Sequence, residues 1–222
     1  MHVIVNAAMS VDGKLSTRRR EQIAISGETD FDRVDAIRAD SDAVMVGVGT
    51  VLADDPSLTV DDSERIDART GRGDPPQPAR VIADSRLRTP ANATVYDDTA
   101  ETIFLVSEAA TDKAVTEAQT RGETVIIAGG DRVDLSAAFE RLEAHGIEQV
   151  LVEGGGELVF SLFEAGLVDE LSVFVGSMVI GGRDAPTLAD GSGFTDQFPQ
   201  LQLRDVERID DGVCLRYRVS GR

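Results

Sequence analysis

The chain has 222 residues, of which 41% are hydrophobic, and this is enough to build the core of one domain. Forty acidic residues against 22 basic ones give a net charge of −18, which argues against nucleic acid or an anionic membrane as a partner. Cys214 is the only cysteine, and His2 and His145 are the only histidines. An internal disulfide is therefore excluded, and we expect neither a metal site nor a histidine-based catalytic triad.

The basic residues are almost all arginines, because Lys14 and Lys113 are the only lysines. An acidic, lysine-poor surface is typical of a halophilic protein, in which salt screens the self-repulsion. An ordinary acidic protein remains the alternative. The chain shows no signal peptide and no apolar run of membrane-spanning length, so we expect a cytoplasmic protein.

The first third of the chain contains two expected strands, His2–Ala8 and Ala43–Val46, and a helix near Asp30–Ala39. Thr50 follows the second strand and is of a type that caps helices, so we expect it to open a short helix. Residues 61–79 show no period and are rich in Pro, Gly and charge. This composition predicts an exposed loop inside a single domain of residues 1–222.

Strands and helices alternate in the rest of the chain up to residue 175. Asp134 can cap a helix that Gly146 ends, and Gly166 can end the next one, with Leu167 packing against Leu162. The alternation predicts a mostly parallel sheet that is flanked by helices. The expected strands are Arg80–Ala83, Ile103–Val106, Thr124–Ala128, Gln149–Val152 and Leu171–Val175, and the expected helices are Thr111–Arg121, residues 134–146 and residues 155–165.

The carboxyl-terminal segment has a different pattern. Leu201–Arg208 and Val213–Val219 flank the turn Asp210-Asp211-Gly212, and apolar residues alternate in the second run. This pattern predicts an antiparallel hairpin. The expected fold is therefore α/β, with a mixed, mostly parallel sheet.

Two glycine-rich corners follow expected strands, where glycine lets a phosphate approach the backbone and a helix start offers free N–H groups. One is "VGVGTV", with Gly49 and Thr50, and the other is "LVEGGGEL", with Gly154, Gly155 and Gly156. Neither has the full dinucleotide or P-loop fingerprint, and each alone is compatible with a simple tight turn. Two such corners in one small sheet favour a dinucleotide cofactor.

Three further features point to ligand chemistry. Ser85 and Arg86 follow a strand and can hold an adenosine 2′-phosphate, which would select NADPH, although a turn with a solvated arginine is as compatible. Lys14 follows an Asp-Gly turn, where it can hold a phosphate, donate a proton or simply be exposed. Glu153 ends a strand and can accept hydrogen bonds from an amino-heterocycle, or serve only as a charge at a helix start.

These features occur in an order that resembles the riboflavin-biosynthesis reductases. That family comprises the 2,5-diamino-6-(ribosylamino)-4(3H)-pyrimidinone 5′-phosphate reductases and the reductase domain of the bifunctional bacterial deaminase-reductases. The resemblance covers about residues 3–185 and implies a dihydrofolate-reductase-like fold, NADPH as cofactor and a homodimer. It also implies the stand-alone type, without a deaminase domain. The motifs that carry it are "SVDGK", "SGETD", "RADSDAVMVGVGTVLADDPSLT", "VEGGGELVFSLFEAGLVDEL" and "GG" near residue 181.

The resemblance also implies roles for individual residues. Those matching cofactor positions are Ala8, Phe31, Thr50, Asp54, Ser85, Gly155, Gly156, Glu157 and Leu158, and those matching substrate positions are Thr29, Arg38, Leu58 and Glu153, with Lys14 in the matching turn. Asp61 is a departure, because the bacterial enzymes often carry an arginine there. A phosphate contact is then lost, or is supplied by Arg38, Lys14 or an arginine of residues 61–79.

The implied reaction transfers a hydride from NADPH to C1′ of the ring-opened ribosylamino group and gives the ribitylamino product. Lys14, or a water held by Asp54, is a candidate proton donor. Two alternatives stay open: a reductase of another pterin or pyrimidine with the same fold, and a non-catalytic nucleotide-binding protein.

Overall fold

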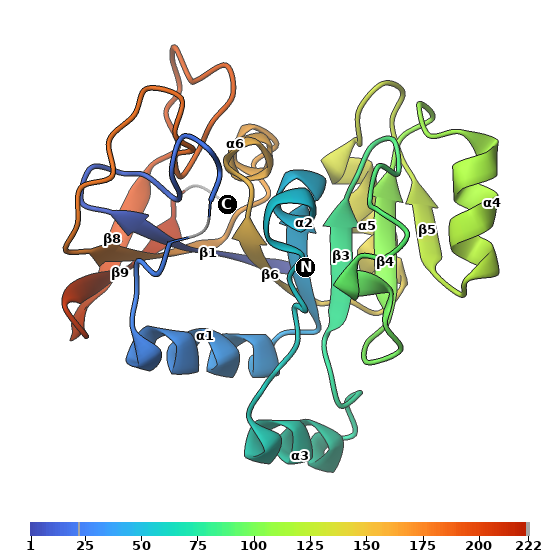
Figure 1. The fold of residues 1–222 in the computed structure, drawn as a ribbon, viewed down its shortest axis with the longest axis horizontal. Helices are drawn as coiled ribbons and strands as arrows, with labels where there is room; N and C mark the ends of the chain where they lie inside the picture. Colours follow the sequence, from blue (N-terminus) through green and yellow to red (C-terminus); the bar gives the residue numbers. More distant parts are fainter. Residues whose placement is uncertain (22, 221–222) are drawn as a thin grey trace. The chain divides into compact units, whose positions relative to one another are not determined.

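The structure is a computed structural model that describes residues 1–21 and 23–220. Its fold is α/β, with a mixed sheet and helices beside it (Figure 1). The strands are β1 (His2–Ser10), β2 (Ala43–Gly47), β3 (Ala79–Ala83), β4 (Thr102–Val106), β5 (Thr124–Ile127), β6 (Gln149–Gly154), β7 (Glu170–Gly176), β8 (Leu201–Ile209) and β9 (Gly212–Val219). The helices are α1 (Glu28–Asp40), α2 (Val48–Asp54), α3 (Ser63–Arg72), the 3₁₀ turn η1 (Thr94–Tyr96), α4 (Asp112–Thr120), α5 (Leu135–Ala144) and α6 (Gly156–Glu164).

Strand pairing follows the order β5-β4-β3-β2-β6-β1-β7-β9-β8. The pairs β2–β3, β3–β4, β4–β5 and β1–β7 are parallel, whereas β7–β9 and β8–β9 are antiparallel. The predicted mixed sheet and the predicted hairpin are therefore confirmed. Contacts within the chain define two compact units, unit 1 with Met1 and Asp35–Leu151, and unit 2 with His2–Val34 and the segment from Val152 onward.

Unit 1 is built on the parallel strands β2, β3, β4 and β5, which stand side by side in Figure 1. Its core contains fully buried side chains such as Val44, Ile82 and Phe104. Asp134 accepts a hydrogen bond from the N–H of Ala137 and so caps α5 as predicted. Continuous apolar strands of this kind need cover on both faces, which explains why helices follow each of them.

Unit 2 is built on β1, β7, β9 and β8. Ile25, Phe174, Ile209 and Cys214 form a buried cluster in it. After α6, the N–H of Leu167 donates to the carbonyl of Leu162, which is the predicted helix end at Gly166.

The expectation of a loop over residues 61–79 is wrong for α3. Asp62 caps this helix by accepting hydrogen bonds from the N–H groups of Glu64 and Arg65. Its buried residue is not apolar: the guanidinium of Arg69 donates to the carbonyls of Ala39, Ser41 and Pro75. Because the buried side chain of α3 is an arginine, the helix lacks the regular spacing of apolar residues that marks an amphipathic helix. Hydrophobic periodicity therefore does not reveal it.

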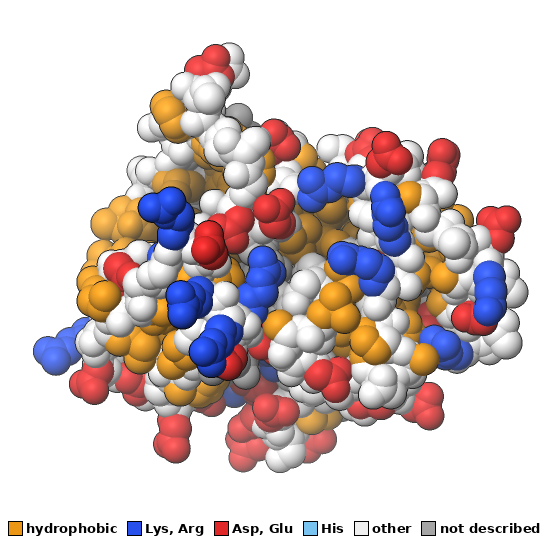
Figure 2. All heavy atoms as spheres, turned by 45° about the horizontal axis from the view of Figure 1, so that its top comes forward, with side chains coloured by type: hydrophobic (Ala, Val, Ile, Leu, Met, Phe, Trp, Pro, Cys, Tyr) orange, Lys and Arg blue, Asp and Glu red, His pale blue; other side chains and the backbone are white. Residues whose placement is uncertain are grey.

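Both signs of charge appear on the face drawn in Figure 2, where acidic side chains crowd the margin. Among the described residues, none of the helices has the length and apolarity that a bilayer crossing requires.

Candidate functional site

The two predicted cofactor segments of unit 1 follow neighbouring strands. Gly47, the last residue of β2, is paired in register with Ala83, the last residue of β3. Gly49 and Thr50 come directly after the first strand, and Ser85 and Arg86 after the second. The carboxyl edge of a parallel sheet is where α/β proteins bind their ligands. The fold therefore brings these four residues to the expected edge.

Thr50 does not cap α2, contrary to the prediction. The helix starts at Val48, and its N-cap is Gly47, which offers no side chain for capping. Thr50 is thus a half-buried residue inside the helix. Asp54 is the last residue of the helix, and partial burial raises the pKa of its carboxyl above the ordinary value.

Ser85 is held by two other loops of the same edge. Its hydroxyl accepts a hydrogen bond from the N–H of Val133 at 3.1 Å, and its carbonyl accepts one from the hydroxyl of Ser107 at 2.9 Å. The Val133 loop contains Gly129, whose φ of 89° no side chain would tolerate well, beside the backbone of Arg132. This loop was not among the predicted features, although the Gly129-Gly130 pair after β5 is a recognisable signal in the sequence.

Arg86 is exposed, and none of the described residues pairs with its guanidinium. The carboxylate beside it, that of Asp84, is fully buried and is bound by the N–H and the hydroxyl of Thr89. Arg86 thus remains available for an external anion.

The corner after α2 is fixed by side chains. Asp55, in the left-handed region with φ 43°, accepts hydrogen bonds from the N–H and the hydroxyl of Thr94 at 2.8 and 2.9 Å. Leu58 is also left-handed, with φ 57°, and its side chain is 1% exposed inside the core of unit 1. Leu58 therefore presents almost none of its surface to a ligand.

Arg38 and the arginines of α3 are already engaged. Arg38 donates to the carbonyl of Thr59 at 2.8 Å, and Arg65 pairs with Asp35 at 2.9 Å. Arg69 binds three carbonyls, and Arg72 lies 3.1 Å from Asp74. None of these guanidinium groups could take a ligand phosphate without sharing or losing a protein partner.

In unit 2, Lys14 lies in a turn that is tied to a distant segment. Asp12 accepts hydrogen bonds from the Ser10 hydroxyl at 2.6 Å and from the N–H groups of Ile180 and Gly181. These bonds, that of Ser10 first, lower the pKa of the Asp12 carboxyl to about 2. Lys14 is half-buried, and its Nζ donates to the carbonyl of Ala185 at 3.2 Å.

The same segment continues to the start of α6. Gly155 is the N-cap, with φ 92°, and Gly156 is the first helical residue. A Cβ on Gly156 would lie 2.4 Å from the carbonyl oxygen of Thr187 and 2.6 Å from the carboxylate of Asp190. Because Lys14 is bridged to Thr187 in an isolated β-bridge, unit 2 brings Lys14 and the start of α6 close together.

The remaining predicted residues of unit 2 occupy different environments. Glu153 and Gly154 are half-buried at the end of β6, Glu157 is exposed, and Leu158 is buried. Ala8 packs against the buried cluster of unit 2.

Thr29 and Phe31 lie in the first turn of α1, and Phe31 is 59% exposed. The Thr29 hydroxyl and the N–H of Asp30 donate to Asp210, at the tip of the β8–β9 hairpin. These contacts, the hydroxyl first, lower the pKa of Asp210. The carboxylate thus anchors the start of α1 from 180 residues away in the sequence.

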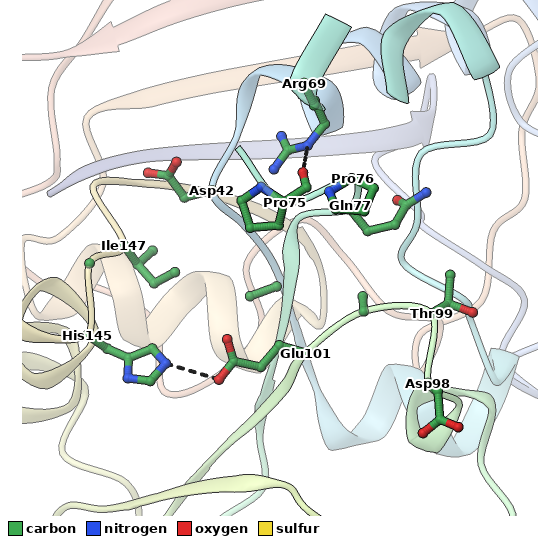
Figure 3. Close-up of a pocket in the computed structure, with 13 residues that line it drawn as sticks. Asp42, Arg69, Pro75, Pro76, Gln77, Asp98, Thr99, Glu101, His145 and Ile147 are labelled. Carbon is green, nitrogen blue, oxygen red and sulfur yellow. Dashed lines mark hydrogen bonds and ion pairs between the residues drawn. The ribbon is translucent and has the colours of Figure 1, made fainter. Parts of the chain in front are cut away.

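Unit 1 also contains a cavity of about 390 Å³ (Figure 3). Ala79 starts β3, and Asp42 and Glu101 directly precede β2 and β4, so the cavity faces the amino ends of the strands. Two contacts are drawn there: His145 Nε2 lies 3.0 Å from Glu101, and Arg69 donates to the carbonyl of Pro75. It contains none of the predicted site residues.

A metal site was not expected, and the described part of the chain groups no three His, Cys, Asp or Glu side chains in a way that could hold an ion. The arrangement instead offers backbone N–H groups, hydroxyls and a few cations at the carboxyl edges of strands. Such groups bind phosphates and heterocycles.

Residues 1–215 match the model of the RibD C-terminal domain. The chain belongs to the RibD C-terminal domain family. A 2,5-diamino-6-ribosylamino-4(3H)-pyrimidinone 5′-phosphate reductase of Archaeoglobus fulgidus is 44% identical to it over 219 residues, which cover 99% of this chain and 98% of that protein. The resemblance that the motifs indicated is thus confirmed over the whole chain.

Solved structures confirm the fold of this RibD C-terminal domain. A pyrimidine reductase-like protein of Corynebacterium diphtheriae superposes with a TM-score of 0.86 at 20% identity, covering 100% of this chain and 92% of that one. A dihydrofolate reductase of Enterococcus faecalis superposes with a TM-score of 0.50 at 9% identity, covering 99% and 97%. The expected dihydrofolate-reductase-like fold is therefore confirmed.

Gly49 and Gly156 form a matched pair for mutation to alanine. A Cβ on Gly49 meets nothing within 4 Å, so Gly49→Ala should stabilise the free protein by about 0.5–1 kcal/mol through its helix propensity. Gly156→Ala should destabilise it, because the backbone of Thr187 must move. Urea unfolding without ligand measures both, and equal effects of the two substitutions would contradict the packing described for α6.

The hydrogen bonds that Asp210 accepts should make the stability of the folded protein depend on pH in the acidic range. Its folded pKa lies below the unfolded value of about 3.9, so the stabilisation is present above pH 4 and is lost as the pH falls through the folded pKa. Asp210→Asn tolerates the left-handed backbone but lacks the charge. We expect it to melt below the wild type at pH 7 and to converge with it in acid. Asp211→Asn, next in the turn, should follow the wild-type melting curve throughout.

Proposed function

We propose that this protein reduces 2,5-diamino-6-(ribosylamino)-4(3H)-pyrimidinone 5′-phosphate to the ribitylamino compound in riboflavin biosynthesis, with NADPH as the reductant. The observation that carries this proposal is the 44% identity to the archaeal reductase over nearly the full length of both chains. Identity at that level across a whole chain supports a shared substrate more strongly than a shared fold does.

NADPH fits the groups that unit 1 presents. When bound, the nicotinamide supplies a hydride to C1′ of the opened ribosylamino group. Gly49 is exposed with open space beside it, Thr50 offers a hydroxyl, and Ser85 and Arg86 can donate to an adenosine 2′-phosphate. The dihydrofolate reductase of the same fold is complexed with NADP(H).

The other residues position the substrate. Glu153 accepts hydrogen bonds from the amino groups of the pyrimidine, and Lys14 faces the ribose phosphate and its oxygens. Thr29, at a substrate position, is fixed by the Asp210 anchor, which also preorganises the turn that contains the cofactor position Phe31. Holding two reactants in a productive geometry supplies much of the acceleration in such a reaction. A proton for the nitrogen or the ring oxygen comes from Lys14 or from water beside Asp54.

The decisive assay follows the nicotinamide absorbance in concentrated KCl, since the net charge of −18 favours a salt-rich medium. Oxidation of NADPH that depends on the ribosylaminopyrimidine phosphate supports the proposal. Turnover only with another pterin or pyrimidine would replace the substrate, and cofactor binding without any turnover would make the protein a nucleotide-binding module.

Arg86 should bind the 2′-phosphate of the cofactor. Arg86→Ala removes an exposed cation that no described residue pairs with, so the fold should not change. We expect KM for NADPH to rise about tenfold, since hydrogen bonds to charged groups are strong, and KM for NADH to stay nearly constant. Equal effects on both cofactors would show that Arg86 does not contact the phosphate.

Glu153 should hydrogen-bond to the pyrimidine of the substrate and not to the cofactor. Glu153→Gln keeps the shape but turns one acceptor into a donor, so kcat/KM should fall at least about tenfold while NADPH binding stays unchanged. The matched control is Glu164→Gln at the exposed end of α6, which should behave as the wild type. Full activity of Glu153→Gln would leave Glu153 as a charge at a helix start.

We also propose a homodimer through the outer hairpin of unit 2. The segment 167–182 is rich in apolar residues, but its strand β7 lies between β1 and β9 with Leu171 and Phe174 buried, and only Val179 beyond the strand is strongly exposed, at 74%. Among the exposed apolar residues, three lie on the single strand β8: Leu201, Leu203 and Val206, which are 39%, 50% and 56% exposed. A second copy of the chain would cover this edge strand.

The dimer predicts a monomerising substitution. Leu203→Asp should convert the dimer to a monomer, because it places a charge in an apolar contact. The control is Gln202→Asp, because successive side chains of a strand point to opposite faces and residue 202 therefore lies on the other face of β8. Light scattering in high salt measures the mass, and a wild-type monomer would refute the dimer.

A further inference from the structure

The carboxylate of Asp84 is buried directly beside the residues proposed to hold the 2′-phosphate of the cofactor, and the proposed reaction gives it no role. Asp84 follows the last residue of β3 and is fully buried. A carboxylate without access to water is stabilised by the donors that the protein supplies. The identity of these donors therefore shows which part of the chain the carboxylate organises.

Each described hydrogen bond to the Asp84 carboxylate comes from its own loop. Oδ2 accepts from the N–H and the hydroxyl of Thr89 at 2.8 and 2.9 Å. Oδ1 accepts from the N–H of Arg86 at 3.4 Å and lies 3.9 Å from Nε of Arg88. An aspartate that binds the backbone N–H two residues on forms a turn around its own side chain. The carboxylate thus closes residues 84–89 into a loop that contains Arg86.

Leu87 shows how this loop presents its arginines. It lies in the left-handed region with φ 50°, and its N–H donates to the Asp84 carbonyl at 3.1 Å. Its side chain packs against the core of unit 1, whereas those of Arg86 and Arg88 on either side are exposed. A left-handed leucine is unfavourable by itself and persists only where its surroundings enforce it. The hydrogen bonds that join Asp84 to Thr89 enforce it here.

The neighbouring residue Ser85 is held from outside the loop. Its carbonyl accepts hydrogen bonds from the N–H and the hydroxyl of Ser107 at 3.1 and 2.9 Å, and its hydroxyl accepts one from the N–H of Val133. These bonds do not involve Arg86. The described contact that fixes the N–H of Arg86 is the one to the Asp84 carboxylate.

We infer that Asp84 is a positioning residue that sets the preference of the protein for NADPH over NADH. It ties Arg86 to Thr89 and so directs the Arg86 guanidinium, without touching the cofactor itself. The inference rests on the proposed function, in which NADPH is the reductant and Arg86 binds its 2′-phosphate. A guanidinium binds a phosphate through directional, paired hydrogen bonds, so the backbone that carries it must be held to within about 0.5 Å.

The charge of Asp84 acts in the opposite direction. A carboxylate near an anion site repels the phosphate, and Arg88 at 3.9 Å offsets this repulsion only in part. Removing the charge alone would therefore favour NADPH, whereas releasing the backbone of Arg86 would disfavour it. The sign of the change in cofactor preference thus separates the two roles.

Asp84→Asn is the decisive substitution. An amide has one acceptor oxygen where the carboxylate has two, so the N–H of either Thr89 or Arg86 would face an NH2 group. We expect the ratio of kcat/KM for NADPH to that for NADH to fall about fivefold, less than in Arg86→Ala. The kcat at saturating NADPH should stay nearly constant. Because both cofactors meet the same protein sample, the ratio does not depend on the fraction of protein that folds.

Thr89 provides a matched pair, and Asp42 a control. Thr89→Val removes the hydroxyl that binds Asp84 and should lower the ratio about twofold, whereas Thr89→Ser keeps the hydroxyl and should behave as the wild type. Asp42 also binds backbone, the N–H groups of Glu148 and Gln149, but it precedes β2 at the amino ends of the strands. Asp42→Asn should lower the melting temperature and leave the ratio unchanged.

An unchanged or increased preference for NADPH in Asp84→Asn would overturn the inference, and so would an equal fall of the ratio in Asp42→Asn. The same preference is measured by binding, through the nicotinamide fluorescence of NADPH and NADH. A protein that does not reduce the ribosylaminopyrimidine phosphate would therefore refute the proposed function and still test Asp84. A wild type that binds both dinucleotides equally would refute the role of Asp84 together with the preference.

Discussion

The guanidinium of Arg80 holds the corner after α2 in place. Arg80 is fully buried, and it donates to the carbonyls of Ser57, Val95 and Asp97 and to the Asp97 carboxylate. Ser57 belongs to the corner after α2, which has no strand partner of its own. Removing the guanidinium would leave the carbonyls of Ser57 and Asp97 without a described donor, while the carbonyl of Val95 would keep its hydrogen bond from the hydroxyl of Thr102. The tie between this corner and the sheet therefore depends on one side chain of β3.

The same corner contains backbone that is unfavourable alone. Non-glycine residues in the left-handed region cost about 1 kcal/mol or more and persist only where their surroundings enforce them. Asp55 is held there by Thr94, and Leu58 by burial of its side chain. Between Asp54 and the backbone of Leu58, the chain is thus preorganised before any ligand arrives. Such preorganisation lowers the entropy that a bound ligand must lose.

The sequence predicted the regular elements well because their signals are local. Apolar strands, the Asp134 cap and the glycine helix ends depend on residues a few positions apart. Helix α3 was missed because its buried residue is Arg69, whose partners lie about 30 positions upstream. The anchor of Thr29 by Asp210 spans most of the chain, so no local pattern could reveal it.

The candidate site divides in the same way. Gly49, Ser85 and Gly156 were found because glycine and serine after a strand have a recognisable pattern. The contacts around such residues could not be predicted from the sequence. The Ser85 hydroxyl already accepts a hydrogen bond from the N–H of Val133, and Leu58 is a core residue. Motifs identify positions, whereas long-range contacts decide which atoms of those positions remain free.

Several acidic residues of this chain bind the backbone of distant segments in addition to giving the surface its negative charge. The carboxylates of Asp12, Asp35, Asp42 and Asp210 each accept hydrogen bonds from backbone N–H groups of distant segments. Asp35 is the instructive case, because it fixes Asp61 and Asp62 and so opens α3. Because Asp35 binds the backbone N–H of residue 61, this contact fixes the start of α3 whichever side chain stands at that position.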